Sequence, residues 1–282
     1  MITVFTIPKK FEGGHIEMIQ RNAIKSWLAL APDVEVILFG NDPGVDRIAR
    51  EFNLLHIPEI RKNNYGTPIL SSVIETAQKK ARHKTIVYIN ADIIVLKDFI
   101  SALKKIEKEK FFMIGQRWDL DLKEPLDFKD ESRIRQLLKE QGKMHGPLGM
   151  DYFAIPRDLE LGMPEFAVGR PAWDNWLIFR MRSLNIPVID ATGSVTAIHQ
   201  NHDYSHSAFG GKKRVAGPEL KEAIKMAGGF TNMLTLRDAY WLLDEKGLVR
   251  PRFPKRIYSL FSLFYPWRLA LAFKRQLQQL IQ

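Results

Sequence analysis

The sequence predicts an α/β fold in which helices cover both faces of a doubly wound, mostly parallel sheet. Two observations carry this prediction. The first hundred residues alternate four times between short runs rich in β-branched residues and segments with apolar residues at helical spacing. One of these runs, at 85–89, is almost continuously apolar, as expected of a parallel strand buried on both faces. Repeated β-α units of this kind build a doubly wound sheet.

Local signals bound each element. Pro8 ends the first strand, a turn cluster at 40–43 ends the second, and Thr67-Pro68 opens the third helix. We expect strands at 2–7, 34–39, 54–57, 85–89 and 111–115, and helices at 16–30, 45–52, 69–81 and 99–108. Residues 117–146 are polar and weakly periodic, like an insertion over a site. The regular pattern returns with a segment at 150–156, a helix at 173–181 and strands at 186–190 and 195–199.

The composition describes a globular chain and excludes several kinds of site. Its 282 residues, 45% of them apolar, suffice for one large domain or two small ones. Because the chain has no Cys, any metal must be bound by carboxylates and imidazoles. We expect a cytoplasmic protein, since the sequence begins with a strand rather than a secretory signal. No apolar run reaches the roughly 18 residues that span a bilayer.

The positive charge is concentrated near the carboxyl terminus. The chain has 42 Lys+Arg and 32 Asp+Glu, a formal charge of +10, and residues 250–282 contain seven basic and no acidic side chains. Aromatic residues interleave with these basic ones, a pattern typical of segments that bind an anionic membrane surface. The same segment fits equally well as a helix packed on the preceding domain. Nucleic-acid-binding proteins more often carry the basic excess on the folded domain, so we expect no nucleic-acid partner.

The sharpest local feature is an Asn-x-Asp motif, Asn90-Ala91-Asp92, directly after the buried strand. Open α/β sheets bind ligands at the carboxyl ends of their strands, and a carboxylate buried there needs a partner or a cation. The motif therefore indicates a hard ligand. An alternative is that Asp92 caps a turn and Asn90 bonds its own backbone.

A second feature is a group of histidines at the end of a later strand. Residues 199–206 contain three of the seven His and one Asp. Imidazole and carboxylate groups can complete the coordination of Mn²⁺ or Mg²⁺, or move protons. Solvated loop histidines with no function are also common.

The third feature is an acid between two indoles, Trp173-Asp174-Asn175-Trp176, at the start of a helix. Asp at that position is favourable for capping and for the helix dipole. Aromatic rings around an acid are also common in carbohydrate pockets. The two Trp side chains could equally belong to the core.

These three features, in this order after an alternating β-α start, resemble the nucleotide-sugar glycosyltransferases with the GT-A fold. The resemblance covers roughly residues 1–205 and implies a Rossmann-like mixed sheet, followed here by a helical C-terminal extension. It implies that Asp92 binds Mn²⁺ or Mg²⁺, that His199 is a late metal ligand, with His202 as the substitute, and that Asp174 lies near the acceptor. Asn90 departs from the family pattern, which usually has Asp at this position.

The resemblance also implies how the substrates lie. The loops after the first strands would contact the nucleotide, and the two indoles of Trp173 and Trp176 would bind the acceptor. Asp174 would be the general base if the enzyme inverts the anomeric centre. The implied donor-binding residues are Thr6, Ile7, Pro8, Lys9, Asp42, Thr67, Ser71, Asn90 and Ala91.

The implied catalytic domain comprises residues 1–206, with a nucleotide-sugar half at 1–115 and an acceptor half at 116–206. A basic, mainly helical region would follow at 207–282. The implied reaction moves a sugar from a nucleotide diphosphate, with a UDP-sugar favoured, to a saccharide or lipid-linked acceptor during surface polysaccharide or glycan assembly. Membrane binding by residues 250–282 would place the enzyme on the inner face of the membrane.

Two alternatives of other classes remain. A nucleotidyltransferase of related fold normally carries a Gly-rich basic signature after its first strand, and residues 9–14 are a faint version of it. A non-catalytic protein that binds an anionic polymer would use the basic tail and its aromatic residues. That alternative gives no reason for the series Asp92, Asp174 and His199.

Overall fold

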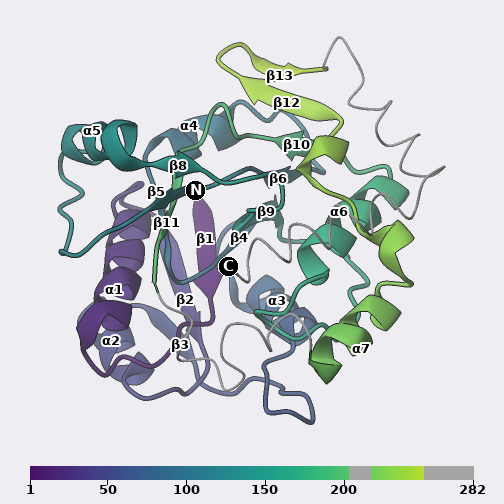
Figure 1. Cartoon of the computed structure of the whole chain (residues 1–282), viewed down its shortest axis with the longest axis horizontal. Helices are drawn as coiled ribbons and strands as arrows, with labels where there is room; N and C mark the ends of the chain where they lie inside the picture. The colour runs from purple at the N-terminus through teal and green to yellow at the C-terminus, as the bar shows by residue number, and fades with distance from the viewer. Residues whose placement is uncertain (203–216, 251–282) are drawn as a thin grey trace.

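The computed structural model describes residues 1–202 and 217–250, and its centre is a nine-stranded sheet (Figure 1). The strand order is β13-β12-β10-β6-β9-β4-β1-β2-β3. The strands are β1 (Ile2–Thr6), β2 (Glu35–Phe39), β3 (Leu55–Ile57), β4 (Thr85–Ile89), β6 (Phe112–Ile114), β9 (Tyr152–Pro156), β10 (Val188–Asp190), β12 (Trp241–Asp244) and β13 (Gly247–Val249). Most neighbours are parallel, whereas β9 runs antiparallel between β4 and β6 and β13 runs antiparallel to β12. The predicted mixed, mostly parallel class is confirmed.

A smaller sheet, with the order β5-β11-β7-β8, lies beside the large one. Its strands are β5 (Ile93–Val95), β7 (Trp118–Leu120), β8 (Lys143–Met144) and β11 (Ala197–Gln200). The helices are α1 (Gly14–Leu28), α2 (Val45–Glu51), α3 (Leu70–Lys80), α4 (Asp98–Lys104), α5 (Ser132–Gln141), α6 (Trp173–Ser183) and α7 (Pro218–Met226). Short 3₁₀ helices occupy Phe230–Asn232 and Leu236–Asp238.

The large sheet is buried on both faces because its side chains alternate between two apolar layers. On β1, Val4 packs in the layer formed with α1, α2 and α4, whereas Phe5 packs in the layer formed with α3, α6 and α7. Figure 1 shows α1 and α2 on one side of β1 and α3, α6 and α7 on the other. The helices therefore cover both faces, as predicted.

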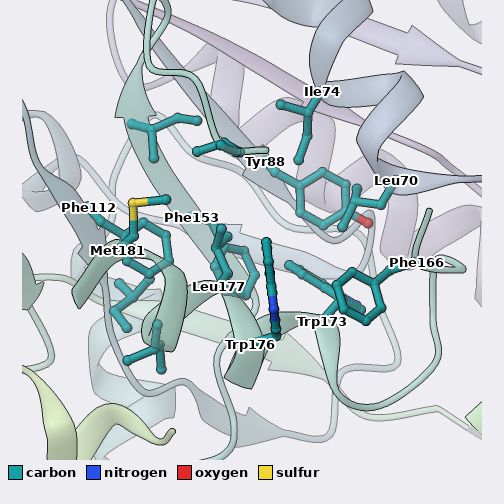
Figure 2. Close-up of a cluster of buried hydrophobic side chains, with 14 of the residues drawn as sticks. Leu70, Ile74, Tyr88, Phe112, Phe153, Phe166, Trp173, Trp176, Leu177 and Met181 are labelled. Carbon is teal, nitrogen blue, oxygen red and sulfur yellow. The ribbon is translucent and has the colours of Figure 1, made fainter. Parts of the chain in front are cut away.

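Aromatic rings fill the layer under α6 (Figure 2). Phe153 on β9 stacks on Phe112 of β6, with ring centroids 6.1 Å apart. The ring centroid of Trp173, at the start of α6, lies 4.7 Å from that of Phe153 and 5.7 Å from that of Tyr88 on β4. These contacts place the first turn of α6 over β9 and over β4, the strand that leads into the Asn90-Ala91-Asp92 motif.

The segment at 117–146 contains more regular structure than its sequence indicates. It contributes β7, α5 and β8, and only Ile134 and Leu138 of α5 are buried against Leu120 of β7 and Ile198 of β11. Two buried residues in a ten-residue helix give a weak periodic signal.

The described part of the C-terminal region contains strands as well as helix. The α7 helix packs on the same face as α3, and the hairpin β12–β13 extends the large sheet from β10. The sequence predicted a mainly helical region here. The basic segment at 251–282 and the loop at 203–216 lie outside the described residues, so the membrane-binding role of the tail stays a prediction. Within 1–202 and 217–250, none of the helices has the length and apolar character needed to cross a bilayer.

We expect Phe153→Ala to reduce the free energy of unfolding by about 3–5 kcal/mol, because it leaves a cavity among packed rings. Urea unfolding followed by circular dichroism measures this loss. Leu184→Ala is the control, since Leu184 is 38% exposed and its truncation should change stability by only about 0.5 kcal/mol. Equal losses in the two variants would contradict the packing described for this layer.

Candidate functional site

The loops predicted to bind a ligand meet at one edge of the large sheet. Parallel pairing sets Phe5 of β1 beside Tyr88 of β4, and Thr6 beside Leu38 of β2. The segments that follow these three strands therefore leave the sheet side by side, at the carboxyl edge where open α/β sheets bind ligands. These segments carry Ile7, Pro8, Lys9, Asp42, Asn90, Ala91 and Asp92.

The structure brings together Asp92, His199 and His202. Antiparallel pairing of β5 with β11 sets Ile93 opposite His199, so the residue after Asp92 faces the histidine strand. Asp92 Oδ2 lies 3.0 Å from His202 Nε2 and 3.8 Å from His199 Nε2. Each of the three residues offers one ligand atom, and these atoms all lie within 4.8 Å of one another. One cation could bind all three.

The environment of Asp92 fits a cation. Its Oδ1 atom is buried and has no hydrogen-bond partner among the described residues, an arrangement that is costly for a carboxylate oxygen. Burial by itself would raise the pKa of Asp92. The hydrogen bond from His202 and the charges of His199, His202 and Lys9 outweigh it and hold the pKa well below its usual range. The carboxylate is therefore ionised, with one oxygen available to a positive ligand.

The backbone of this loop is fixed from behind by buried polar side chains. Gln200 is fully buried, and its backbone and side-chain N–H groups both donate to the carbonyl oxygen of Asp92, at 3.2 and 3.1 Å. Asn22 of α1 in turn donates to Gln200 Oε1, at 3.0 Å. Trp27 Nε1 donates to the carbonyl of Ile93 at 2.9 Å. Helix α1 thus anchors both the acid and the strand that follows it.

A chain of polar contacts leads from Asn90 back to His199. Asn90 Nδ2 donates to Asp151 Oδ1 at 2.5 Å, and Asp151 Oδ2 accepts a short bond from Arg117. Arg117 Nε also donates to Asp119 Oδ1 at 3.0 Å, and that oxygen lies 3.4 Å from His199 Nδ1. We call this set, Asn90, Asp151, Arg117, Asp119, His199 and Asp92, the polar ring.

Sequence reasoning did not identify Arg117, Asp119, Asp151 or His145. Asp151 precedes β9, and only the antiparallel pairing of β9 with β4 sets it beside Asn90. His145 donates from Nδ1 to Asp119 Oδ2, at 2.6 Å. Burial would raise the pKa of Asp119, but hydrogen bonds to His145 and His199 and the charge of Arg117 lower it strongly.

Asp174 lies half-buried in the first turn of α6, and its Oδ1 accepts a hydrogen bond from the Asn175 backbone at 2.9 Å. Asp174 lies two residues after the N-cap, Ala172, where its negative charge is favourable for the helix dipole. Asp174 is not part of the group formed by Asp92, His199 and His202.

The expected acceptor-binding role of Trp173 and Trp176 is corrected. Each indole is only 7% exposed. Trp173 packs on Phe153, and Trp176 lies 5.4 Å from Phe166 (Figure 2). Neither ring presents an open face on which a sugar could stack, so both belong to the core.

The other residues expected to bind the donor differ in burial. Thr6 is fully buried, and its hydroxyl has no hydrogen-bond partner among the described residues. Ser71 is buried in the first turn of α3. The side chain of Thr67 is hydrogen-bonded to Glu219 of α7. Asp42 is exposed after β2.

No protein-family model and no curated protein matches the sequence. Among solved structures, the chain is similar to S. aureus TarS residues 1–349 in complex with UDP-GlcNAc, with a TM-score of 0.49 and 15% identity over 80% of this chain and 65% of that one. It is also similar to glucosyl-3-phosphoglycerate synthase from Mycobacterium tuberculosis in complex with Mg²⁺ and UDP, with a TM-score of 0.49 and 14% identity over 81% of this chain and 79% of that one. The chain thus spans less than two thirds of that TarS chain, and both similarities concern the course of the backbone alone.

We expect Asn90→Asp to destabilise the protein by about 1–3 kcal/mol, because it replaces a donated hydrogen bond with two facing carboxylates. The double variant Asn90→Asp/Asp151→Asn reverses the pair and should recover much of this loss. The amide of the new side chain can donate to position 90 while its oxygen accepts from Arg117. Urea unfolding of both single variants and the double variant gives the coupling energy. Additive losses would show that the two side chains do not interact.

Proposed function

We propose that this chain is a metal-dependent glycosyltransferase that takes a sugar from a nucleotide diphosphate donor, with a UDP-sugar favoured. The observation that carries the proposal is the group Asp92, His199 and His202 at the carboxyl edge of a mostly parallel sheet. A half-buried, ionised acid, whose buried Oδ1 has no partner among the described residues, supports a site for a cation and an anionic ligand at this edge.

Asp92, His199 and His202 would hold the cation. Two imidazole nitrogens beside one carboxylate suit Mn²⁺ better than Mg²⁺, which prefers oxygen ligands. The cation, when bound, neutralises negative charge on the departing nucleoside diphosphate. Lys9, whose charge already acts on Asp92, would add a second positive group at the same edge.

The chain's own residues would bind the rest of the donor. In this proposal the segment 6–9 after β1 and Asp42 after β2 contact the base and ribose. Thr67 and Ser71, at the start of α3, and Asn90 with Ala91 contact the ribose and the diphosphate. Asn90 is held in one orientation by its bond to Asp151, which supports a fixed geometry at this part of the site.

Asp174 is the proposed acid near the acceptor and the general base if the reaction inverts the anomeric centre. The proposed acceptor is a saccharide or a lipid-linked saccharide, within the assembly of surface polysaccharides or glycans. The proposed domain division follows, with the nucleotide-sugar half at 1–115 and the acceptor half at 116–206. Residues 250–282 would bring the enzyme to an anionic membrane surface at the cytoplasmic face.

The nucleotide can be identified by calorimetry and thermal shift with UDP, GDP, CDP and TDP, with and without Mn²⁺ or Mg²⁺. We expect stabilisation by one nucleotide diphosphate that requires the metal and is lost in Asp92→Ala, because the cation loses its carboxylate ligand. Asp158→Ala is the matched control, since Asp158 follows β9 at the opposite edge of the sheet and its side chain is 84% exposed. Binding that depends on salt but not on metal would favour the anionic-polymer alternative.

We expect Asp174→Asn to leave donor affinity unchanged while the rate of transfer falls by about 10²–10⁴-fold, the usual contribution of a general base. Calorimetry with the nucleotide found above measures the first quantity. Transfer to a panel of saccharide and lipid-linked acceptors measures the second. An unchanged transfer rate would remove Asp174 from the mechanism.

A further inference from the structure

Asp119 occupies a position from which it can act on the candidate metal ligand His199. It lies on β7, which pairs in parallel with β11, and the register sets Asp119 directly beside His199. Its Oδ1 atom lies 3.4 Å from His199 Nδ1. Its Oδ2 atom lies 2.6 Å from His145 Nδ1. One carboxylate thus lies between two imidazole rings, one on β11 and the other on the residue that directly follows β8.

The surroundings of His199 determine which of its nitrogens carries the proton. Nδ1 faces Asp119 Oδ1 at 3.4 Å and Asn201 Oδ1 at 3.2 Å. The amide nitrogen of Asn201 donates to Asp121 at 2.8 Å, so the amide presents its oxygen to His199. Two acceptors at Nδ1 require Nδ1–H, so in the neutral ring the lone pair lies on Nε2.

The Nε2 atom of His199 is directed toward Asp92. It lies 3.8 Å from Asp92 Oδ2, too far for a hydrogen bond, and belongs to the group whose ligand atoms lie within 4.8 Å of one another. A metal-binding imidazole needs its lone pair at the coordinating nitrogen and a partner at the other one. His199 meets both conditions only in the Nδ1–H form.

Asp119 is itself held in place. Arg117 Nε donates to its Oδ1 at 3.0 Å, and the same guanidinium binds Asp151 beside the Asn90 motif. The side chain of Asp119 is 23% exposed and that of Arg117 is 12% exposed. A carboxylate fixed from two sides can fix the ring that it touches.

We propose that Asp119 is a positioning residue that holds His199 as the Nδ1–H tautomer, with Nε2 presented beside Asp92. The effect on metal affinity rests on the proposed function, whereas the effect on the ring of His199 does not. A purely structural role would instead have Asp119 act through His145, as a link between β7 and β8.

The direct test is long-range ¹H–¹⁵N NMR of the imidazole rings in full-length protein labelled at His, with His199→Gln to assign the signal. The wild type should show His199 as Nδ1–H. Asp119→Ala should shift the ring toward a mixture of tautomers, and Asp119→Asn, which keeps an acceptor oxygen, should restore part of the Nδ1–H form. An unchanged His199 signal in Asp119→Ala would overturn the proposal.

Calorimetric titration with Mn²⁺ alone gives the second readout. Asp119→Ala should weaken Mn²⁺ binding by about 10–100-fold, as loss of such a partner usually does. His145→Gln removes the other imidazole and should change the affinity less than about threefold. Asp127→Ala, an exposed acid in the same insertion, is the control. An equal loss in His145→Gln and Asp119→Ala would assign Asp119 a structural role and overturn the proposal.

The two readouts separate the possible failures. If wild-type protein binds no Mn²⁺, the proposed metal site fails, and the tautomer of His199 still decides whether Asp119 holds the ring. Thermal unfolding shows whether each variant is folded. If Asp119→Ala does not fold, Asp119→Asn replaces it in both the NMR and the calorimetric measurements.

Discussion

The carboxylate of Asp92 is the charge around which this site is organised. It follows β4, whose last four residues are buried, and an ionised group at this point needs compensation from its surroundings. The compensation comes from imidazoles at 199 and 202, while the loop backbone is fixed through Gln200. One oxygen of Asp92 still has no partner among the described residues, so a positively charged ligand could bind this oxygen.

Sheet register, rather than loop structure, determines which groups meet. The first residue of the antiparallel strand β9, Tyr152, pairs with the last residue of β4, Ile89. This pairing sets Asp151 beside Asn90. In the small sheet, β11 lies between β5 and β7, so His199 has Ile93 on one side and Asp119 on the other. Groups fixed on strands keep their distances more accurately than groups on loops. In the polar ring, Asp119 and His199 lie on strands, and the other four residues lie directly next to a strand end, so the sheets determine where all six meet.

The sequence allowed the fold class and the three metal-ligand candidates to be predicted because these follow from local patterns. Asp92 and His199 each stand at the end of an apolar run. Asp119 and Asp151 could not be found in this way, because their contacts depend on which strands become neighbours. Asn90 and Asp151, for example, are separated by more than sixty residues in the sequence. The indoles at 173 and 176 were misassigned because helical spacing does not distinguish a core face from a pocket wall. The short helix at 132–141 buries too few residues to give a clear period.

The presence of Asn rather than Asp at position 90 follows from the charge of the frame. The polar ring contains three carboxylates, at 92, 119 and 151, and one guanidinium, at 117, so before any charge on the imidazoles its net charge is −3 + 1 = −2. A fourth carboxylate at position 90 would face Asp151 at hydrogen-bond distance and raise the excess to −3, at a point where solvent is largely excluded. Asn90 avoids that repulsion and supplies the N–H that Asp151 needs. The amide at position 90 is thus matched by an acid that directly precedes the neighbouring strand β9.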